Sequence, residues 1–557
     1  MVKYGSLEEV PDYIRGNLGK YFTNVGGDTF VIRNFPPELA GGALARYSRA
    51  STGIQLTLVN EFLDDNGEPN QEKGSALMDR VLNAFGDESV GELEGAHMGI
   101  EDISQLLTKE IEDRRIGGSP IEQSTRYVRY DQKNSEGEWR YLRPKEIRES
   151  GLLGRFEETN DRAFEVYSKG VAGLTNYFKI QVPEEEFEIE VDRDGKKVKV
   201  KKSDLKNYAE LRAHRNARNF TVRCAALDVG RCVLPSSALT HVGLFGNGRF
   251  YTTLITHLGS SELYEARERS GKIREELDKH IPTFVKRSRV DKKREEINRR
   301  MTDVSLELFS GMIPKTDFVT LVPYAARHVS FMDEVVSAAL FPYTNISLGQ
   351  ILSVVSGMPE ERKMEVIKTY RGKRESRRDR TGRGLEAGYP IKFDLVGGFA
   401  EYRDLERHRM LTQQRQILTT DLGFILPSEM VEVGLENEVL EVVGMMEDLN
   451  GEFRKEGLTY ASQYATLFNH RIRFMMGMNL REFQHLSELR TTPTGHFSYR
   501  SMVMKMASQL SSRDPWSKEF YEFVNYSDPG NKISRANEQS RIAGKNLAKD
   551  VEGDVDF

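Results

Sequence analysis

The sequence SPIEQSTRY occupies residues 119–127. Within nine residues it offers the carboxylate of Glu122, the hydroxyl of Ser124, the guanidinium of Arg126 and the phenol of Tyr127. A guanidinium binds phosphate in a bidentate manner, a hydroxyl donates to it, and a carboxylate accepts from a ring N–H. This loop is therefore a candidate for binding a phosphorylated, base-bearing ligand. A loop that caps a helix and carries a surface salt bridge explains the same residues.

The segment before this loop, residues 99–115, reads GIEDISQLLTKEIEDRR. Its apolar side chains recur at helical spacing and are Ile100, Ile103, Leu106, Leu107 and Ile111. Such spacing predicts an amphipathic helix, and the GGSP that follows must end it. We therefore expect a helix that delivers the polar loop from Gly117 onward.

Two further clusters carry groups suited to a nucleotide. Asn479 and Arg490 are eleven residues apart, so one helical face would hold both, about 16 Å apart along its axis. Such a helix would touch both ends of an extended ligand, although an amphipathic surface helix explains the pattern too. The triplet Arg407-His408-Arg409 suits a pyrophosphate, and a basic helix end produces it as well.

Composition limits the class of protein. The 557 residues exceed what one hydrophobic core usually supports, and 38% hydrophobic with 30% charged residues is typical of a soluble globular protein. A net charge of -5 argues against a chain-wide nucleic-acid surface. The two cysteines, Cys224 and Cys232, lack the spacing of a metal site, so we predict no metal. Without a signal-peptide pattern or a membrane-length apolar run, the sequence predicts a cytoplasmic protein.

Four segments stand apart from these clusters. Residues 184–202 alternate around Asp-Gly, which predicts a solvated hairpin, an insertion, with acidic side chains facing basic ones. The charged run 265–303 suits an exposed helix that connects two domains, with the boundary near 300 to 315. The basic stretch 368–384 suits either a solvated loop or a contact with phosphate or nucleic acid. The polar sequence after Tyr526 predicts a flexible tail.

Taken in order, these segments resemble the flavin-dependent thymidylate synthases of the ThyX type, whose signature reads RHRxxSxNExSxRY. Residues 114–127 keep the Glu, Ser, Arg and Tyr of that signature but lack its His. Residues 407–409 keep the Arg-His-Arg, whereas the later signature positions hold Arg415, Ile417, Thr419 and Thr420. The chain thus resembles two diverged copies of one family unit that have lost complementary parts of the signature.

Other positions extend the resemblance. Arg231 lies in GRCVLP, which looks like the family's ARxVLP segment, and Arg490 matches the family's final arginine. Ser51 resembles a flavin-contacting serine, and Asp87 stands where a histidine is usual. The family's NxR motif is matched in both copies, by Asn247 with Arg249 and by Asn479 with Arg481.

The resemblance implies an α+β fold made of two ThyX-like units, each a mainly antiparallel sheet with packed helices. We expect the first unit over residues 1–300, the second over 301–526 and the tail over 527–557. Because the family assembles as a tetramer of single units, a fused pair is expected to form a homodimer.

The resemblance also implies a reaction, the conversion of dUMP to dTMP with methylenetetrahydrofolate, FAD and NADPH. One composite site would take Glu122, Ser124, Arg126, Tyr127 and Arg231 for the substrate. Arg490 would act on the pyrimidine, and the cofactor would be held by Ser51, Asn247, Arg249, Arg407, His408, Arg409, Asn479 and Arg481. A different flavin-dependent C5 modification, such as hydroxymethylation, and a non-catalytic nucleotide- or nucleic-acid-binding protein are the alternatives.

Overall fold

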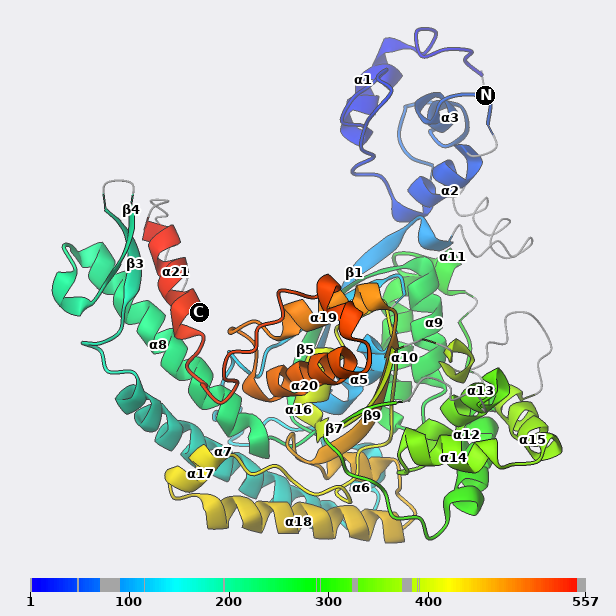
Figure 1. Cartoon of the computed structure of the whole chain (residues 1–557). Helices are drawn as coiled ribbons and strands as arrows, with labels where there is room; N and C mark the ends of the chain where they lie inside the picture. The colour runs from blue at the N-terminus through cyan, green and yellow to red at the C-terminus, as the bar shows by residue number, and fades with distance from the viewer. Residues whose placement is uncertain are drawn as a thin grey trace. The chain divides into compact units, whose positions relative to one another are not determined.

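The computed structural model describes residues 3–47, 50–70, 91–114, 116–193, 196–286, 288–290, 292–322, 329–372, 383–387, 389 and 391–547 (Figure 1). The chain divides into two compact units, and each is built from several segments. The first unit comprises Met1–Ile103, Leu107–Glu122 and Thr240–Glu295. The second comprises Ser104–Leu106, Gln123–Leu239 and Glu296–Phe557.

The first unit contains a three-stranded sheet in the order β1-β5-β2, formed by β1 (Gly95–Ser104), β5 (Leu239–Asn247) and β2 (Gly118–Glu122). Strand β2 pairs antiparallel with β5, with Gly118 opposite Gly246. Helices α9 (Gly248–Gly259), α10 (Tyr264–Asp278) and α11 (Pro282–Val285) pack on one another after β5. A separate apolar cluster joins α1 (Asp12–Tyr21), α2 (Pro37–Tyr47) and α3 (Ile54–Glu61).

The helix predicted over residues 99–115 is wrong in its first half. Residues Gly95–Ser104 form β1, and only α5 (Gln105–Glu112) is helical. Asp102 has a positive φ of 50°, a conformation that interrupts the regular alternation of a strand. Ile100 and Ile103 are therefore both buried although they are three residues apart, and this spacing imitates a helix.

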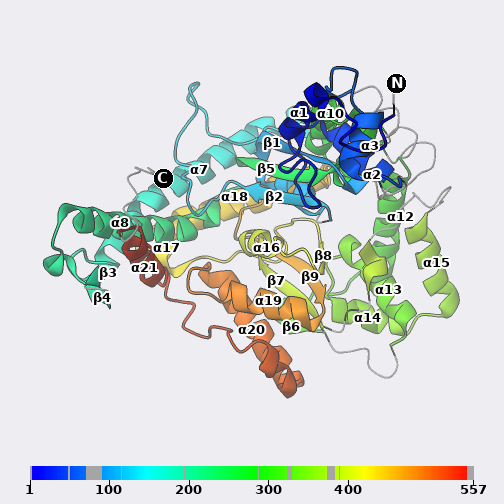
Figure 2. The same ribbon diagram turned by 90° about the horizontal axis from the view of Figure 1, so that it is seen from above.

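The second unit contains a four-stranded antiparallel sheet in the order β6-β7-β9-β8. Its strands are β6 (Val319–Leu321), β7 (Ile391–Gly398), β9 (Arg471–Met478) and β8 (Thr412–Arg415). All eight residues of β7 are buried, as expected for a central strand. Helices α16 (Phe399–Leu405), α19 (Leu480–Arg490) and α20 (Phe497–Arg513) pack together beside this sheet (Figure 2).

Long helices complete the second unit. Helix α7 (Leu153–Gln181) packs against both α8 (Tyr208–Gly230) and α18 (Glu436–Lys455). Four further helices share an apolar core: α12 (Lys292–Phe309), α13 (Phe331–Leu340), α14 (Leu348–Ser356) and α15 (Glu360–Arg371). Short helices α6 (Lys145–Arg148) and α17 (Ser428–Glu432) flank α7. No helix among the described residues is both long and apolar enough to cross a bilayer.

Apart from short inserted elements, a similar order of elements occurs twice along the chain, with two long helices in the first run where the second has one. The first run is β1, α5, β2, α7, α8, the 3-10 turn Arg231–Val233, β5 and α9. The second run is β7, α16, β8, α18, the 3-10 turn Ala461–Tyr464, β9 and α19. In both sheets the third strand of the run lies between the first and the second. These two sheets with their packed helices confirm the predicted α+β class.

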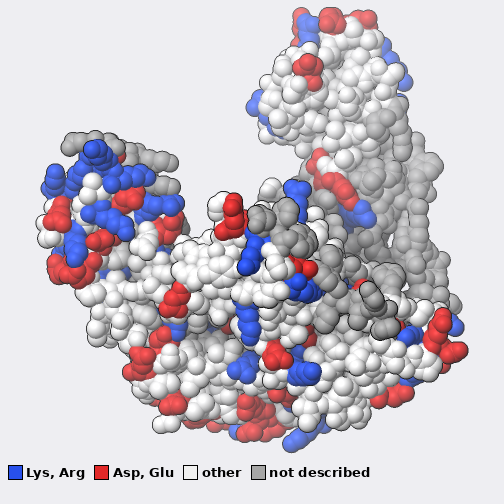
Figure 3. All heavy atoms as spheres, in the orientation of Figure 1, with Lys and Arg blue, Asp and Glu red and all other residues white. Residues whose placement is uncertain are grey.

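The predicted hairpin is present as β3 (Ile189–Arg193) and β4 (Lys196–Val200), and its turn lies outside the described residues. The predicted facing of charges is confirmed, because Glu190 lies opposite Lys199 and Asp192 opposite Lys197. The hairpin is not fully solvated, however, since Ile189 is buried. Basic and acidic side chains together cover the part of this region that faces the viewer in Figure 3.

A helix, α21 (Ala536–Leu547), occupies part of the segment where we expected a flexible tail. It packs against α8 and β3 of the same unit. The apolar side chain of Ala543 is buried there, and Ser540 is buried as well. The polar composition of the segment is therefore compatible with packing because only one face of a short helix is covered.

Other expectations meet the structure in part. The charged run 265–303 includes helix α10, but Ile281, Phe284 and Val285 within it are buried, so it is not exposed throughout. Most of the basic stretch 368–384, together with Asp87, lies outside the described residues.

Candidate functional site

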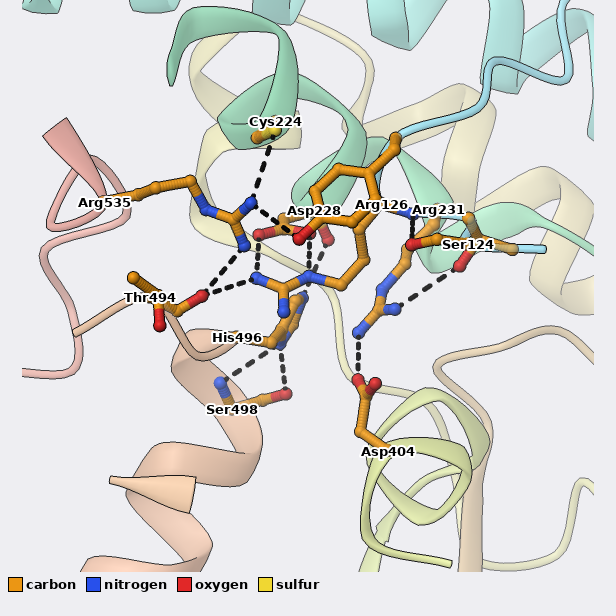
Figure 4. Close-up of polar contacts among 12 residues, drawn as sticks. Ser124, Arg126, Cys224, Asp228, Arg231, Asp404, Thr494, His496, Ser498 and Arg535 are labelled. Carbon is orange, nitrogen blue, oxygen red and sulfur yellow. Dashed lines mark hydrogen bonds and ion pairs between the residues drawn. The ribbon is translucent and has the colours of Figure 1, made fainter. Parts of the chain in front are cut away.

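The arginine predicted to bind phosphate lies in a buried ion pair. Arg126, in the loop after β2, donates from Nε and one terminal nitrogen to the two carboxylate oxygens of Asp228 at 2.7 and 2.8 Å (Figure 4). Asp228 lies in the last turn of α8, and both side chains are buried. Burial alone would raise the pKa of Asp228, but the charge of Arg126 outweighs it and lowers that pKa to about 2.

A second buried guanidinium, that of Arg231, follows directly at the end of α8. One of its terminal nitrogens lies 3.3 Å from a carboxylate oxygen of Asp404 on α16, and the other lies 3.4 Å from the hydroxyl of Thr125. Its Nε is buried and has no hydrogen-bond partner among the described residues. Burial opposes ionisation of Asp404, yet Arg231 and Arg126 hold its pKa well below the usual range.

His496 joins these groups from the start of α20. Its Nε2 donates to the backbone carbonyl of Asp228 at 3.1 Å, and its Nδ1 lies 2.8 Å from the hydroxyl of Ser498. Burial, reinforced by the positive charge of Arg231, lowers the pKa of His496 to about 3. The imidazole is therefore neutral at physiological pH. We call Arg126, Asp228, Arg231, Asp404 and His496 the arginine site.

A third guanidinium reaches the arginine site from the C-terminal segment. Arg535 donates to the carbonyl oxygen of Thr494 at 2.8 Å and to the hydroxyl of Tyr127 at 3.0 Å. It also lies 3.6 Å from the sulfur of Cys224 (Figure 4). Arg126 approaches the same Thr494 oxygen at 3.4 Å. Two guanidiniums thus converge on one neutral carbonyl.

The Arg-His-Arg triplet and the final arginine also meet. His408 Nδ1 lies 2.8 Å from a carboxylate oxygen of Glu482, and Nε of Arg490 donates to His408 Nε2 at 2.9 Å. His408 is buried, whereas Arg407 and Arg409 on either side are exposed. Burial lowers the pKa of His408, and Arg490 acts in the same direction against the hydrogen bond with Glu482. We call Glu482, His408 and Arg490 the His408 network.

Tyr499, on α20, connects the His408 network to the arginine site. The Arg490 guanidinium lies 5.7 Å from the centre of the Tyr499 ring, which in turn lies 6.2 Å from the His496 ring. Within the second unit, Tyr499 therefore connects Arg490, the final arginine of α19, with His496 of the arginine site. This region combines the positive charges of the arginine site with a separate guanidinium, that of Arg490.

Several predicted site residues have structural partners. The side chain of Asn247 caps α9 by accepting from Phe250 N at 2.8 Å, and Asn479 caps α19 by accepting from Glu482 N at 3.0 Å. The two predicted NxR asparagines thus occupy equivalent positions at the end of a strand. Arg249 pairs with Glu92, and Arg481 is exposed.

Glu122 lies in the first unit, in a buried ion pair. Lys109 Nζ is 3.1 Å from one of its carboxylate oxygens, and the Thr108 hydroxyl is 3.5 Å from the other. Ser51 belongs to the same unit and is exposed. In the arginine site, the hydroxyl of Ser124 accepts from the backbone N–H of Arg126 at 3.3 Å. This hydrogen bond joins two residues of the same loop and helps to fix the conformation of the loop.

Sequence reasoning did not identify Asp228, Asp404, Glu482, His496 or Arg535. Three of them lie close in sequence to residues that were identified. Asp228 precedes Arg231 by three residues at the end of α8, Asp404 precedes Arg407 by three at the end of α16, and Glu482 adjoins Arg481 at the start of α19. Their proximity in sequence to the predicted arginines was a usable signal, because a carboxylate is the usual partner of a guanidinium. Arg535 carried no such signal.

Comparison with known proteins shows which family this chain belongs to. The family model described as thymidylate synthase complementing protein matches residues 36–283 and 390–516, more than half of the chain. This chain belongs to that family. The match has two segments, which fall on the two runs of elements described above.

Relatives of this chain match it over most of its length. A UPF0159 protein of Chlamydia muridarum is 32% identical over 551 residues, 95% of this chain and 97% of its own. A UPF0159 protein of Chlamydia pneumoniae is 32% identical, over 96% of this chain and 99% of its own. One from Thermoplasma acidophilum is 30% identical, over 88% and 95%. Each alignment therefore spans more than four fifths of both chains.

A solved structure of flavin-dependent thymidylate synthase ThyX from Helicobacter pylori, complexed with FAD and dUMP, also aligns with this chain. It is 18% identical, covers 46% of this chain and 96% of the solved one, and has a TM-score of 0.25.

Proposed function

We propose that this chain is a flavin-dependent thymidylate synthase that converts dUMP to dTMP. In the overall reaction methylenetetrahydrofolate supplies the carbon, and NADPH with one proton supplies the two reducing equivalents, so the products are dTMP, tetrahydrofolate and NADP. Membership in the thymidylate synthase complementing protein family supports this reaction class. The observation that carries it is the meeting of the arginine site with the His408 network at Tyr499.

The arginine site suits the phosphate of the nucleotide. Arg126 and Arg231 are held in place by Asp228 and Asp404, so their guanidinium planes are oriented before a ligand arrives. The unpartnered Nε of Arg231 provides a donor within this pre-arranged set. A fixed, water-poor cluster of donors binds a phosphate more strongly than flexible surface arginines do.

Arg490 suits the pyrimidine ring. Its Nε is tied to His408, and within the described part of the chain its two terminal nitrogens have no hydrogen-bond partner. A guanidinium held at one edge presents its other edge in a fixed direction. There it would stabilise negative charge that develops on the uracil as C5 becomes nucleophilic. No cysteine is needed for this role, and burial raises the pKa of Cys224 to about 11.

The residues around His408 fit a flavin nucleotide. Arg407 and Arg409 present positive charge at the surface on both sides of the buried imidazole, which suits a pyrophosphate. Exposed Asn479 and Arg481 at the start of α19 extend this surface. A bound flavin would supply the hydride transfer from NADPH. The protein would orient it and hold the nucleotide's C5 within reach.

We further propose that the two runs of elements are diverged copies of one unit, with the boundary near residue 300. The first copy would contribute Arg126 and Arg231, and the second His408 and Arg490. One composite site per pair of runs would remain, in a chain that pairs with a second copy as a homodimer. The repeated order of elements and the two matched segments support this proposal.

One assay tests the reaction directly. Purified protein is expected to bind FAD and to oxidise NADPH faster when dUMP and methylenetetrahydrofolate are added, with dTMP detected by mass spectrometry. Arg490→Gln and Arg126→Gln should each abolish the dUMP-dependent rate, whereas Arg454→Gln on the surface of α18 should not. Absence of flavin binding, or of any dUMP effect in the unmodified protein, would refute the proposal and leave a non-catalytic role. A hydroxymethyl product in place of dTMP would select the other C5 chemistry.

A further inference from the structure

The C-terminal segment brings a buried positive charge into the arginine site without a counter-charge. Arg535 is only 7% exposed. Its partners are the Thr494 carbonyl, the Tyr127 hydroxyl and the Cys224 thiol, all of which are neutral. Among the described residues, no carboxylate lies within ion-pair distance of it. Because a buried guanidinium without a counter-charge is unfavourable, such an arrangement favours the binding of an anion.

The surrounding charges leave this excess in place. Asp228 is bonded at both oxygens to Arg126, and Asp404 is paired with Arg231. Three buried guanidiniums therefore share two carboxylates. Buried Arg403, which lies 3.5 Å from the Thr125 hydroxyl, adds to this positive excess, because burial raises the pKa of nearby Glu401 and disfavours its charged form. His496 is neutral. The positive charges of the site therefore exceed its negative charges by at least one, and a bound anion would balance them.

Several contacts hold the C-terminal segment at this position. The hydroxyl of Ser534 donates to the Pro493 carbonyl at 2.6 Å, and buried Arg500 reaches Ser527 at 3.0 Å. Lys532 forms an ion pair with Glu429. Helix α21 then packs on α8, the helix that carries Asp228. Contacts before and after it in the sequence thus hold Arg535 in place, and its guanidinium points toward Thr494 and Cys224 (Figure 4).

We infer that Arg535 is a third phosphate-binding arginine and that the C-terminal segment is part of the substrate site. The anion would be the phosphate of the nucleotide, and this identity rests on the proposed function. The phosphate would accept the hydrogen bonds that Arg126 and Arg535 donate to the Thr494 carbonyl in this structure. Tyr127, whose ring lies 5.2 Å from the Arg535 guanidinium, is 43% exposed and marks the side from which a ligand reaches the site.

Calorimetric titration of the full-length protein tests this inference with three probes, namely inorganic phosphate, dUMP and deoxyuridine. Arg535→Gln should raise the Kd for phosphate and for dUMP by about 10- to 100-fold, the usual effect of losing a charged hydrogen bond. It should leave deoxyuridine binding unchanged. Arg541→Gln is the matched control, because Arg541 lies exposed on α21, the helix that follows Arg535, and among the described residues its ion-pair partner is Glu538. Arg535→Lys keeps the charge without the planar fork, so a smaller loss is expected.

The outcomes separate the two proposals. Unchanged phosphate affinity in both Arg535 variants would overturn the inference even where dUMP binds and turns over. Phosphate binding that depends on Arg535, with no dUMP binding, would support the anion site and refute the proposed nucleotide. Both proposals would be overturned if the unmodified protein bound neither phosphate nor dUMP. Should Arg535→Gln fail to fold, the partial loss in Arg535→Lys decides the matter.

Discussion

Arg490 donates a hydrogen bond from Nε to Nε2 of His408, with 2.9 Å between the two atoms. His408 in turn directs Nδ1 toward a carboxylate oxygen of Glu482 at 2.8 Å. Because Nε2 accepts from Arg490 it carries no proton, so the imidazole is neutral and its Nδ1–H donates to the carboxylate. The three side chains therefore fix the plane in which the Arg490 guanidinium lies.

The first prediction concerns this orientation. His408→Leu should lower kcat for dUMP-dependent NADPH oxidation by about 10- to 100-fold, because small displacements of a positioned group cost catalysis on this scale. Steady-state kinetics at saturating dUMP provides the measurement. Arg454→Gln, which removes an exposed ion pair with Asp421, is the control. An unchanged kcat would mean that Arg490 does not depend on His408.

The second prediction concerns the pair formed by Arg126 and Asp228. Arg126→Met leaves a buried carboxylate without its principal partner, and breaking a buried pair in this way costs about 3 to 5 kcal/mol of stability. The double variant Arg126→Met with Asp228→Leu should recover most of that loss, while phosphate binding stays absent. Urea unfolding and calorimetry measure the two effects. Equal stability of the single and double variants would contradict this account.

The third prediction is a pH dependence from His496. Its pKa is lowered to about 3 in the folded chain, first by burial and then by Arg231. As the pH falls below about 6.5, the ordinary pKa of a histidine, this imidazole therefore binds a proton in the unfolded chain before it does so in the folded chain. The stability from the neutral imidazole is complete above about pH 6.5 and declines toward pH 3, by at most about 1.4 kcal/mol per pH unit.

His496→Gln isolates this contribution, since glutamine can still donate to the Asp228 carbonyl but does not titrate. The free energy of unfolding, measured between pH 6.5 and 4.5, should fall less steeply in the variant than in the unmodified protein. Asp228, with a pKa lowered to about 2, adds its own loss mainly below pH 4. Identical slopes in the two proteins would show that His496 is not held neutral.

The fourth prediction concerns Glu122. Glu122→Gln removes one of the two carboxylates that pair with buried Lys109, the other being Glu112, so the melting temperature of the ligand-free protein should fall. Because both oxygens of Glu122 already have partners, dUMP affinity should stay within about twofold, a difference of less than 0.5 kcal/mol. Differential scanning calorimetry and titration measure these quantities. A large loss of dUMP affinity with phosphate affinity retained would instead assign Glu122 to the pyrimidine.

Local patterns in the sequence predicted local structure where neighbouring residues settle it. The facing charges of the hairpin follow from alternation around a turn, and the structure pairs Glu190 with Lys199. The helix expected over residues 99–115 was wrong because one residue with a positive φ gives a strand the spacing of a helix. The spacing of apolar residues in the sequence does not reveal such an interruption of a strand.

The sequence by itself determined which chemical groups this chain offers: the SPIEQSTRY loop, Arg231, the Arg-His-Arg triplet and Arg490. Only the tertiary structure decided how they are partnered. Asp228 meets Arg126 across 102 residues, and Arg535 meets Tyr127 across 408. Burial makes such partnerships decisive, because a charge removed from water requires a counter-charge or a ligand. Which residue lies near enough to supply the counter-charge depends on how helices and loops distant in sequence pack together.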